Sequence, residues 1–380
     1  MDESPGRAEA RVDLSSIRAN VAALCHHAAP AEVMAVVKAD GYGHGILESA
    51  RAAQAGGATW LGVATLDEAV TLREAGITGR VLCWLAAPGE PWHRAVAADV
   101  DVSAGASWAV REIAAAAERV SRPARLHLKA DTGLGRGGCP PADWADLLGV
   151  SLAAQAQGSV RVVGLWSHLA CADEPGHPSI RAQQDAFLAA LQVAERAGVR
   201  PEVRHLANSA GTLTLPESRY DLVRAGISAY GLLPGPLLGE PERYGLRPAM
   251  TLTARLTSVK RVPAGHGVSY GHRYTTSRET TLGLVPLGYA DGISRHGSNR
   301  LPLLAAGRRR TVAGTVCMDQ FVVDLGDDDA SAGDQVLLFG PGDAGEPTAQ
   351  DWADTLGTIA YEVVTGVRGR ARRVYVGEGW

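Results

Sequence analysis

Four residues that could do chemistry stand at the ends of short apolar stretches, or inside them. They are Lys38 in MAVVK (34–38), Lys129 in RLHLK (125–129), His168 in VVGLWSH (162–168) and Arg224 in LVRAGI (222–227). If these stretches are parallel strands of one barrel, their carboxyl ends form one face, where the chemistry of such folds lies. Buried like charges need an anionic partner. The sequence therefore predicts a cation-rich pocket for an anionic ligand, such as a phosphorylated one.

Lys38 runs into a glycine-rich segment, AVVKADGYGHG. An amine at the mouth of a barrel can form a Schiff base when burial or cationic neighbours lower its pKa from about 10.4. The glycines at 41, 43 and 45 allow the backbone to approach a ligand closely. The segment GLGRGG at 133–138 lacks the spacing of a dinucleotide-binding loop, so we do not interpret it as one.

The elements that would position these residues alternate along the first 230 residues. Eight apolar runs are present, at 34–38, 60–64, 80–85, 100–104, 125–129, 162–168, 203–207 and 222–227. Ala-rich segments with helical spacing separate them, for example 107–120 and 180–198, and Thr65 and Glu68 have capping-box spacing. Apolar strands separated by helices predict a parallel sheet. Eight units favour a (β/α)8 TIM-type barrel, and a doubly wound open sheet is the alternative.

The pattern changes in the Pro/Gly-rich stretch at 234–248. Beyond it, alternating strands with glycine-marked turns follow, and a helical pattern recurs near 349–365. This predicts a C-terminal, mainly β domain. We place the barrel at 13–236 and the β domain at 237–380, with 1–12 as a strand segment that can pack with the β domain.

Composition excludes several classes of protein. A net charge of -4 over 380 residues argues against a nucleic-acid or polybasic membrane role. The sequence contains no run of about 18 apolar residues, so it predicts no membrane span. The N-terminus shows no apolar leader pattern. The five cysteines include no CxxC pair, which is typical of free thiols in a reducing cytoplasm.

Eight segments, taken in order, resemble the blocks of the alanine racemase family. They are AVVKADGYGHG, HLKADTGLGRGG, WSHLACADE, ANSAGTL, DLVRAGISAYG, GVSYGHRY, GYADGISRHG and VCMDQFVVDLG. The first resembles the family's cofactor-lysine signature, which has Ala or Gly at the position of Gly41. The resemblance covers nearly the whole chain. It implies an isomerase that interconverts L- and D-alanine with pyridoxal 5′-phosphate and supplies D-alanine for cell-wall peptidoglycan.

The resemblance also assigns cofactor contacts. Lys38 resembles the lysine that holds pyridoxal phosphate as an internal aldimine. The phosphate-binding set is matched by Tyr42, Ser209, the backbone of Gly226 and Ile227, and Tyr361. Arg224 resembles the partner of the pyridine nitrogen. Because arginine stays protonated, it would leave that nitrogen unprotonated, which favours quick reprotonation over transamination.

Racemisation needs a base on each face of the substrate Cα. The resemblance implies Lys38 on one face and Tyr270 on the other. His168 and Arg224 resemble the hydrogen-bonded cationic pair that lowers the pKa of the phenol from about 10.

The remaining matches concern the substrate and its access route. Arg136 and the backbone amide of Met318 resemble the contacts of the substrate carboxylate, and Lys129 resembles a carbamylated lysine that orients Arg136. The polar entryway is matched by Asp173, Tyr289 and Arg295. Thr315 stands where the family usually has an arginine, which predicts a looser gate, and the ending VRGRARRVYV lacks the family's proline. No metal is implied.

The barrel would carry Lys38 and the β domain Tyr270, so the resemblance implies a homodimer with shared sites. A decarboxylase of the barrel type would have an acidic residue in place of Arg224. A pyridoxal-phosphate carrier would be a single barrel without a β domain. A racemase that prefers serine stays open, because a hydroxyl difference in a pocket is worth only about 1–3 kcal/mol.

Overall fold

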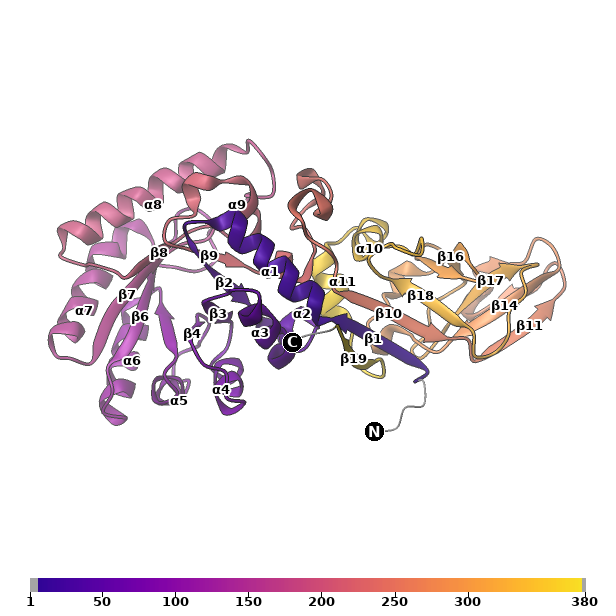
Figure 1. The fold of residues 1–380 in the computed structure, drawn as a ribbon, viewed down its shortest axis with the longest axis horizontal. Helices are drawn as coiled ribbons and strands as arrows, with labels where there is room; N and C mark the ends of the chain where they lie inside the picture. Colours follow the sequence, from indigo (N-terminus) through magenta and orange to yellow (C-terminus); the bar gives the residue numbers. More distant parts are fainter. Residues whose placement is uncertain (1–5, 378–380) are drawn as a thin grey trace.

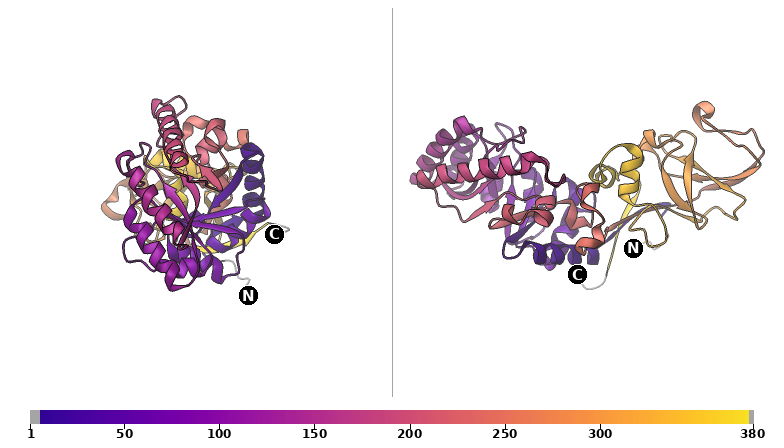
Figure 2. Two further views of the ribbon diagram at one scale, coloured as in Figure 1. Left: turned by 90° about the vertical axis from the view of Figure 1, so that its left-hand side faces the viewer. Right: turned by 90° about the horizontal axis from the view of Figure 1, so that it is seen from above.

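The computed structural model describes residues 6–377, which form two bodies along the long axis of the molecule (Figure 1). Strands surrounded by helices form the N-terminal body, and strands predominate in the C-terminal body. Viewed along the long axis, the helices of the first body lie around its strands (Figure 2). Residues 1–5 of the predicted strand segment and residues 378–380 of the predicted β domain lie outside the described residues.

Among the described residues, the N-terminal body holds eight parallel strands in the order β8-β7-β6-β5-β4-β3-β2-β9. Their bounds are β2 (Glu32–Val36), β3 (Trp60–Val63), β4 (Arg80–Cys83), β5 (Asp101–Ala104), β6 (Ala124–Lys129), β7 (Val160–Trp166), β8 (Val203–His205) and β9 (Leu222–Ala225). All eight apolar runs are therefore confirmed as strands. A backbone hydrogen bond from Asp221 N to Arg204 O, 3.1 Å long, joins the segments of β8 and β9. The nearly closed barrel is confirmed, and the open sheet is excluded.

Helices cover the outside of the barrel. Their bounds are α1 (Leu14–Ala28), α3 (Ile46–Ala55), α4 (Leu66–Glu74), α5 (Trp92–Ala97), α6 (Ser107–Arg119), α7 (Trp144–Ala156), α8 (Pro178–Arg196) and α9 (Ser209–Thr214). The predicted capping box of α4 is confirmed: Thr65 Oγ1 accepts from Glu68 N, and Glu68 Oε2 accepts from Thr65 N. Within residues 6–377, none of the helices is both long enough and apolar enough to cross a membrane.

The C-terminal body is built on a sheet that runs, in the described residues, β11-β14-β17-β16-β15-β18-β10-β1-β19. The bounds are β1 (Ala8–Asp13), β10 (Met250–Arg255), β11 (Ser258–Val262), β14 (Thr280–Val285), β15 (Pro302–Ala305), β16 (Arg308–Ala313), β17 (Phe321–Gly326), β18 (Gln335–Phe339) and β19 (Arg372–Val376). A small ribbon pairs β12 (Gly267–Val268) with β13 (Tyr274–Thr275), and α10 (Ala349–Leu356) and α11 (Ala360–Gly366) occupy the predicted helical region.

One strand of this sheet, β15, departs from the sequence pattern, whereas β1 packs with the C-terminal sheet as expected. β15 is short and begins at Pro302, a residue that usually argues against a strand, so the pattern did not reveal it. β1 pairs antiparallel with β10 and parallel with β19, which ties the start of the chain to its end. α1 follows β1 directly and packs in the other body. Residues 13–14 thus connect the two bodies, and a second connection follows β9.

Candidate active site

A cavity of about 640 Å³ opens at the carboxyl ends of the barrel strands. Lys38, Lys129, Arg136 and Arg224 line it together with His168, so the structure brings together the four residues that the strand ends indicated. Among the described residues of the lining there is no carboxylate side chain. The cavity is therefore suited to an anion.

Lys38 follows β2 and begins a short irregular turn, α2 (Lys38–Tyr42). Ala39 and Asp40 both have φ of +52°, a left-handed conformation that costs roughly 1 kcal/mol or more for a residue with a Cβ. Glu68 stabilises the turn, because its Oε1 accepts from Ala39 N at 2.7 Å and its Oε2 accepts from Ala64 N at 2.9 Å. Burial and the charge of Arg136 lower the pKa of Lys38, which favours its neutral, nucleophilic form.

The residues matched to a phosphate site lie close together at one end of the cavity. Ser209 Oγ accepts from Gly226 N at 2.8 Å, and a Cβ at Gly226 would lie 2.5 Å from the hydroxyl oxygen of Tyr42. The rings of Tyr42 and Tyr361 are 6.0 Å apart. Burial raises the pKa of both phenols, so they remain hydrogen-bond donors at neutral pH. Ile227 is buried at the start of η3 (Ile227–Tyr230), directly after Gly226.

The guanidinium group of Arg224 is held by four acceptors. Its Nη2 donates to the carbonyls of Ser167 (2.7 Å) and Leu206 (3.0 Å) and to Nδ1 of His168 (3.2 Å), and its Nη1 donates to Nδ1 of His205 (3.1 Å). Burial lowers the pKa of Arg224 to about 9, which leaves the group charged at neutral pH. The site therefore contains a fixed cation whose orientation is set by the barrel.

His168 and Lys129 are affected by this cation. Burial, and then the charge of Arg224, lower the pKa of His168 well below its ordinary value. The expected cationic pair is thus a neutral imidazole beside a charged guanidinium. Burial and the charges of Arg224 and Arg136 lower the pKa of Lys129 to about 8. An appreciable fraction of the Lys129 amine is therefore neutral near physiological pH.

Tyr270 and Met318 lie on the C-terminal body and do not line this cavity. They line a separate surface hollow of about 660 Å³, where Tyr270 is 75% exposed and Met318 52% exposed. Thr315, in contrast, is buried behind this surface. Within one chain the structure does not bring Lys38 and Tyr270 together.

The three residues matched to the entryway are also divided between the bodies. Asp173 lies on the barrel side, close enough to Tyr361 to add to the raised pKa of that phenol, of which burial is the larger cause. Tyr289 lies in η7 (Tyr289–Asp291), and Arg295 in η8 (Arg295–Gly297), both in the C-terminal body. Tyr289 lines the same hollow as Tyr270.

Several residues that line the cavity were missed by the sequence analysis. They are Trp84, Leu85, Ser103, Trp166, Asn208 and Ile359. Trp84 and Leu85 stand at the end of the run RVLCWL, so their strand-end position was the available signal. Trp166 is an apolar residue within a strand, so the sequence gave no signal for it. In the structure its ring lies 4.8 Å from the guanidinium of Arg224 and 4.6 Å from the amine of Lys129.

The fold and the site define a class of enzyme: a (β/α)8 barrel with a lysine-bearing, cation-lined cavity at its carboxyl mouth, joined to a β domain. Residues 12–234 match the family model for the N-terminal domain of alanine racemase, and residues 249–375 match that for its C-terminal domain. The chain belongs to the alanine racemase family. It is accordingly an isomerase of the amino-acid racemase class.

Individual relatives agree with the family match. The chain is 60% identical to the alanine racemase of Frankia casuarinae, over 97% of this chain and 96% of that protein. It is also 60% identical to the alanine racemase of Streptomyces coelicolor, over 98% and 96%. The crystal structure of alanine racemase from D-cycloserine producing Streptomyces lavendulae superposes with a TM-score of 0.97 at 59% identity, over 99% of this chain and 98% of that one.

Proposed function

We propose that this protein interconverts L- and D-alanine with pyridoxal 5′-phosphate as its cofactor. The observation that carries the proposal is the amine of Lys38, which lies with a lowered pKa in a cavity whose other charged groups are cations. When bound there, pyridoxal phosphate would draw electrons away from the substrate Cα and make its hydrogen acidic. The likeness to known alanine racemases supports the choice of substrate.

The cavity fits this cofactor in charge and in donor type. A phosphate dianion would offset the excess of positive charge in the cavity. Hydroxyl groups and backbone amides of the site would donate hydrogen bonds to it. Lys38 would hold the cofactor covalently. The phosphate would be bound by Tyr42, Ser209, the backbone amides of Gly226 and Ile227, and Tyr361. The glycine at 226 matters because a side chain there would collide with the hydroxyl of Tyr42.

Arg224 would donate to the pyridine nitrogen of the cofactor. A guanidinium has no acceptor and does not readily give up its proton, so it would leave that nitrogen unprotonated. Its other N–H groups are already used by His168, His205 and two carbonyls, which keeps it from rotating away. This restrained donor would limit electron withdrawal and favour rapid return of the proton to the substrate.

Arg136 would bind the substrate carboxylate, aided by the backbone amide of Met318 from the C-terminal body. Lys129 would carry a carbamate formed with carbon dioxide. Its pKa of about 8 leaves enough neutral amine for that reaction. The resulting anion would orient Arg136 and remove one of the repelling cations from the cavity.

Inversion at Cα would use Lys38 and Tyr270 on opposite faces, one removing a proton and the other returning it. His168 would support the phenolate of Tyr270. Its ring is neutral and its Nδ1 accepts from Arg224, so its proton is on Nε2, from which it can donate to the phenolate oxygen.

The two bases would come from different subunits of a homodimer. In one chain Tyr270 lines a hollow separate from the cavity of Lys38 and is largely exposed, together with Tyr289 and Met318. A head-to-tail dimer would cover this surface and complete two equivalent sites. The functional units would be the barrel at 13–236 and the β domain at 237–380, with 1–12 joined to the latter. Asp173, Tyr289 and Arg295 would form the polar entryway.

The D-alanine made in this way would supply cell-wall peptidoglycan, whose precursors are assembled in the cytoplasm. The test is a panel of L-amino acids incubated with purified, cofactor-loaded enzyme and resolved by chiral chromatography. We expect D-alanine to form fastest, and Lys38→Ala to abolish its formation. Faster turnover of serine would reassign the substrate, release of carbon dioxide would indicate a decarboxylase, and cofactor binding without turnover would indicate a carrier.

A further inference from the structure

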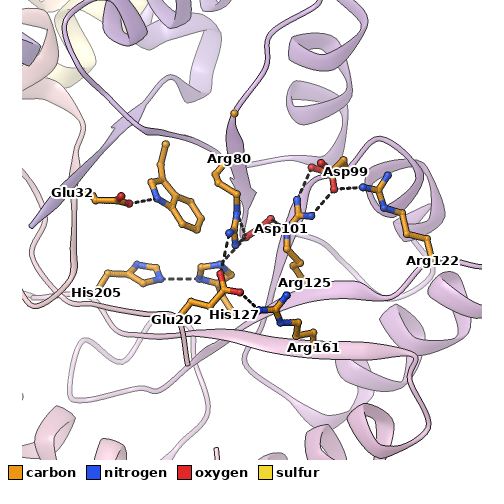
Figure 3. Close-up of polar contacts among 12 residues, drawn as sticks. Glu32, Arg80, Asp99, Asp101, Arg122, Arg125, His127, Arg161, Glu202 and His205 are labelled. Carbon is orange, nitrogen blue, oxygen red and sulfur yellow. Dashed lines mark hydrogen bonds and ion pairs between the residues drawn. The ribbon is translucent and has the colours of Figure 1, made fainter. Parts of the chain in front are cut away.

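A chain of buried hydrogen bonds runs from Arg224 through the barrel interior to Asp101 at the opposite mouth. Arg224 Nη1 lies 3.1 Å from Nδ1 of His205, and Nε2 of His205 lies 2.9 Å from Nδ1 of His127. Nε2 of His127 lies 3.1 Å from Oδ2 of Asp101. Figure 3 shows the part of this chain from His205 to Asp101 and the ion pairs beyond it.

The donor in each of these bonds is fixed by the two ends of the chain. Arg224 has no acceptor, so Nδ1 of His205 must accept and its ring proton is on Nε2. That N–H donates to Nδ1 of His127, whose own proton must then be on Nε2. This second N–H donates to the carboxylate of Asp101. Both imidazoles are therefore neutral, and burial together with the charge of Arg224 lowers the pKa of His205 well below its usual range.

The barrel holds both rings tightly in place. The ring of Trp166 stacks on His205 with centroids 5.4 Å apart, and Trp60 meets the ring of His127 edge-on at 5.6 Å. A Cβ on Gly164 would lie 2.0 Å from Nδ1 of His127, so the absence of a side chain there makes room for the ring. His127, His205 and Asp101 are fully buried. Water is therefore kept from competing with the chain.

Asp101 is the anion at the far end of this chain. It is the first residue of β5, and it accepts from Arg80 Nη2 and Arg125 Nε, each at 2.5 Å. Burial by itself would raise the pKa of Asp101, but hydrogen bonds from His127 and Arg80 outweigh burial and lower the pKa to about 2. Glu202 lies beside it at the same mouth and contacts Arg80 at 3.0 Å, but it does not contact either histidine of the chain.

We propose that Asp101 is a positioning residue for the reaction: through His127 and His205 it keeps Nδ1 of His205 unprotonated, and so holds Arg224 as a donor toward the cofactor ring. This rests on the proposed role of Arg224. If both rings took the other tautomer, the N–H of His205 would face an N–H of Arg224. Two donors in contact would repel, and the guanidinium would rotate or shift.

The first test reads the tautomers directly. In 15N-histidine-labelled holoenzyme, NMR should show His127 and His205 protonated on Nε2 alone at neutral pH. Asp101→Asn presents an amide whose NH2 group can donate to His127, which should move the ring protons toward Nδ1. A wild-type His205 protonated on Nδ1, or tautomers unchanged in Asp101→Asn, would overturn the proposal. Because this readout needs no turnover, it stands apart from the proposed function, which fails instead if wild type racemises nothing.

The second test compares Asp101→Asn with Glu202→Gln, which disturbs the same ionic cluster without touching the histidines. We expect Asp101→Asn to lower kcat about 10- to 100-fold with KM little changed, as for other residues that fix a tautomer or orient a reacting group from behind. Glu202→Gln should keep kcat within about twofold of wild type. Equal losses of kcat in the two variants, in step with melting temperature, would show a structural role only.

Gly164→Ala provides a test if Asp101→Asn does not fold. Its added methyl group would displace the ring of His127 and leave every charge in place. We expect the same loss of kcat and a change in the His205 tautomer. Gly149→Ala, where a Cβ meets nothing within 4 Å, is the matched control and should behave as wild type. Normal kcat in Gly164→Ala with a displaced His127 signal would overturn the proposal.

Discussion

The hydroxyl of Thr315 donates a hydrogen bond of 2.9 Å to the backbone carbonyl of Tyr270. Ser269, the neighbour of Tyr270, donates in turn from its Oγ to the carbonyl of Thr315 at 2.7 Å. The two segments therefore restrain each other, and Thr315 fixes the backbone that carries the proposed second base.

Replacing Thr315 by valine should remove this support while conserving shape. The lost hydrogen bond is worth about 1 kcal/mol, so we expect kcat to fall roughly fivefold. Steady-state kinetics would measure the change, and cofactor absorbance should stay at the wild-type level because the barrel is untouched. Thr315→Ser keeps the hydroxyl and serves as the control. Wild-type kcat in the valine variant would mean that the bond does not position Tyr270.

Lys38 should be the residue that binds the cofactor covalently. Its amine is nucleophilic because burial and Arg136 lower its pKa. Borohydride reduction of the loaded protein followed by peptide mapping should place the pyridoxyl group on Lys38. Lys129 is the internal control, since its amine lines the same cavity and also has a lowered pKa. Label on Lys129 instead would reverse the two assignments.

Arg224→Glu should change the outcome of the reaction as well as its rate. A carboxyl group beside the pyridine nitrogen would favour its protonation and strengthen the ring as an electron sink. We expect racemisation to fall, while a long-wavelength absorbance band and transaminated product appear. Stopped-flow spectra and product analysis would measure both. Wild-type activity with no new band would contradict the role of Arg224.

Mixed dimers should recover activity from two inactive parents. Lys38→Ala and Tyr270→Phe homodimers should each be nearly inactive. After subunit exchange, about half of the dimers are mixed and each has one intact site, so roughly a quarter of wild-type activity should return. Differently tagged subunits would verify the exchange. Verified exchange without recovery would place both bases in one chain.

Stability should fall as pH drops below about 6.5, the unfolded pKa of histidine. In the folded protein, burial disfavours the charged forms of three histidines and lowers their pKa values below this unfolded value: His44, His168 and His205. The pKa of His44 falls to about 4. The unfolded state then binds more protons, so at about pH 5.5 each should cost about 1.4 kcal/mol of unfolding free energy. Urea unfolding at about pH 7.5 and 5.5 would measure the sum of about 4 kcal/mol. His44→Phe should remove about a third of the loss; an unchanged loss would exclude His44 as a source.

Much of the fold could be predicted from the sequence because its signals are local. Each barrel strand is an apolar run between helical segments, and the cap formed by Thr65 and Glu68 depends on two residues three apart. The cationic cavity could also be predicted from the sequence, because parallel strands bring their carboxyl ends to one face whatever their order. The strand β15 could not be predicted in this way, because its four residues begin with Pro302 and carry no local strand signal.

The tertiary structure alone decided which side chains meet across the barrel. His127 is 26 residues from Asp101 and 78 from His205, and their contact depends on the lateral register of strands that no local pattern specifies. In the sequence both histidines lie within predicted strands beside other polar residues, and nothing local marks their partners. Glu68 gave a helix-cap signal only, although its carboxylate also holds the turn after Lys38. The sequence determined which elements form and which of their ends carry charge; packing determined the partners, because a closed barrel brings together interior side chains that lie far apart in the chain.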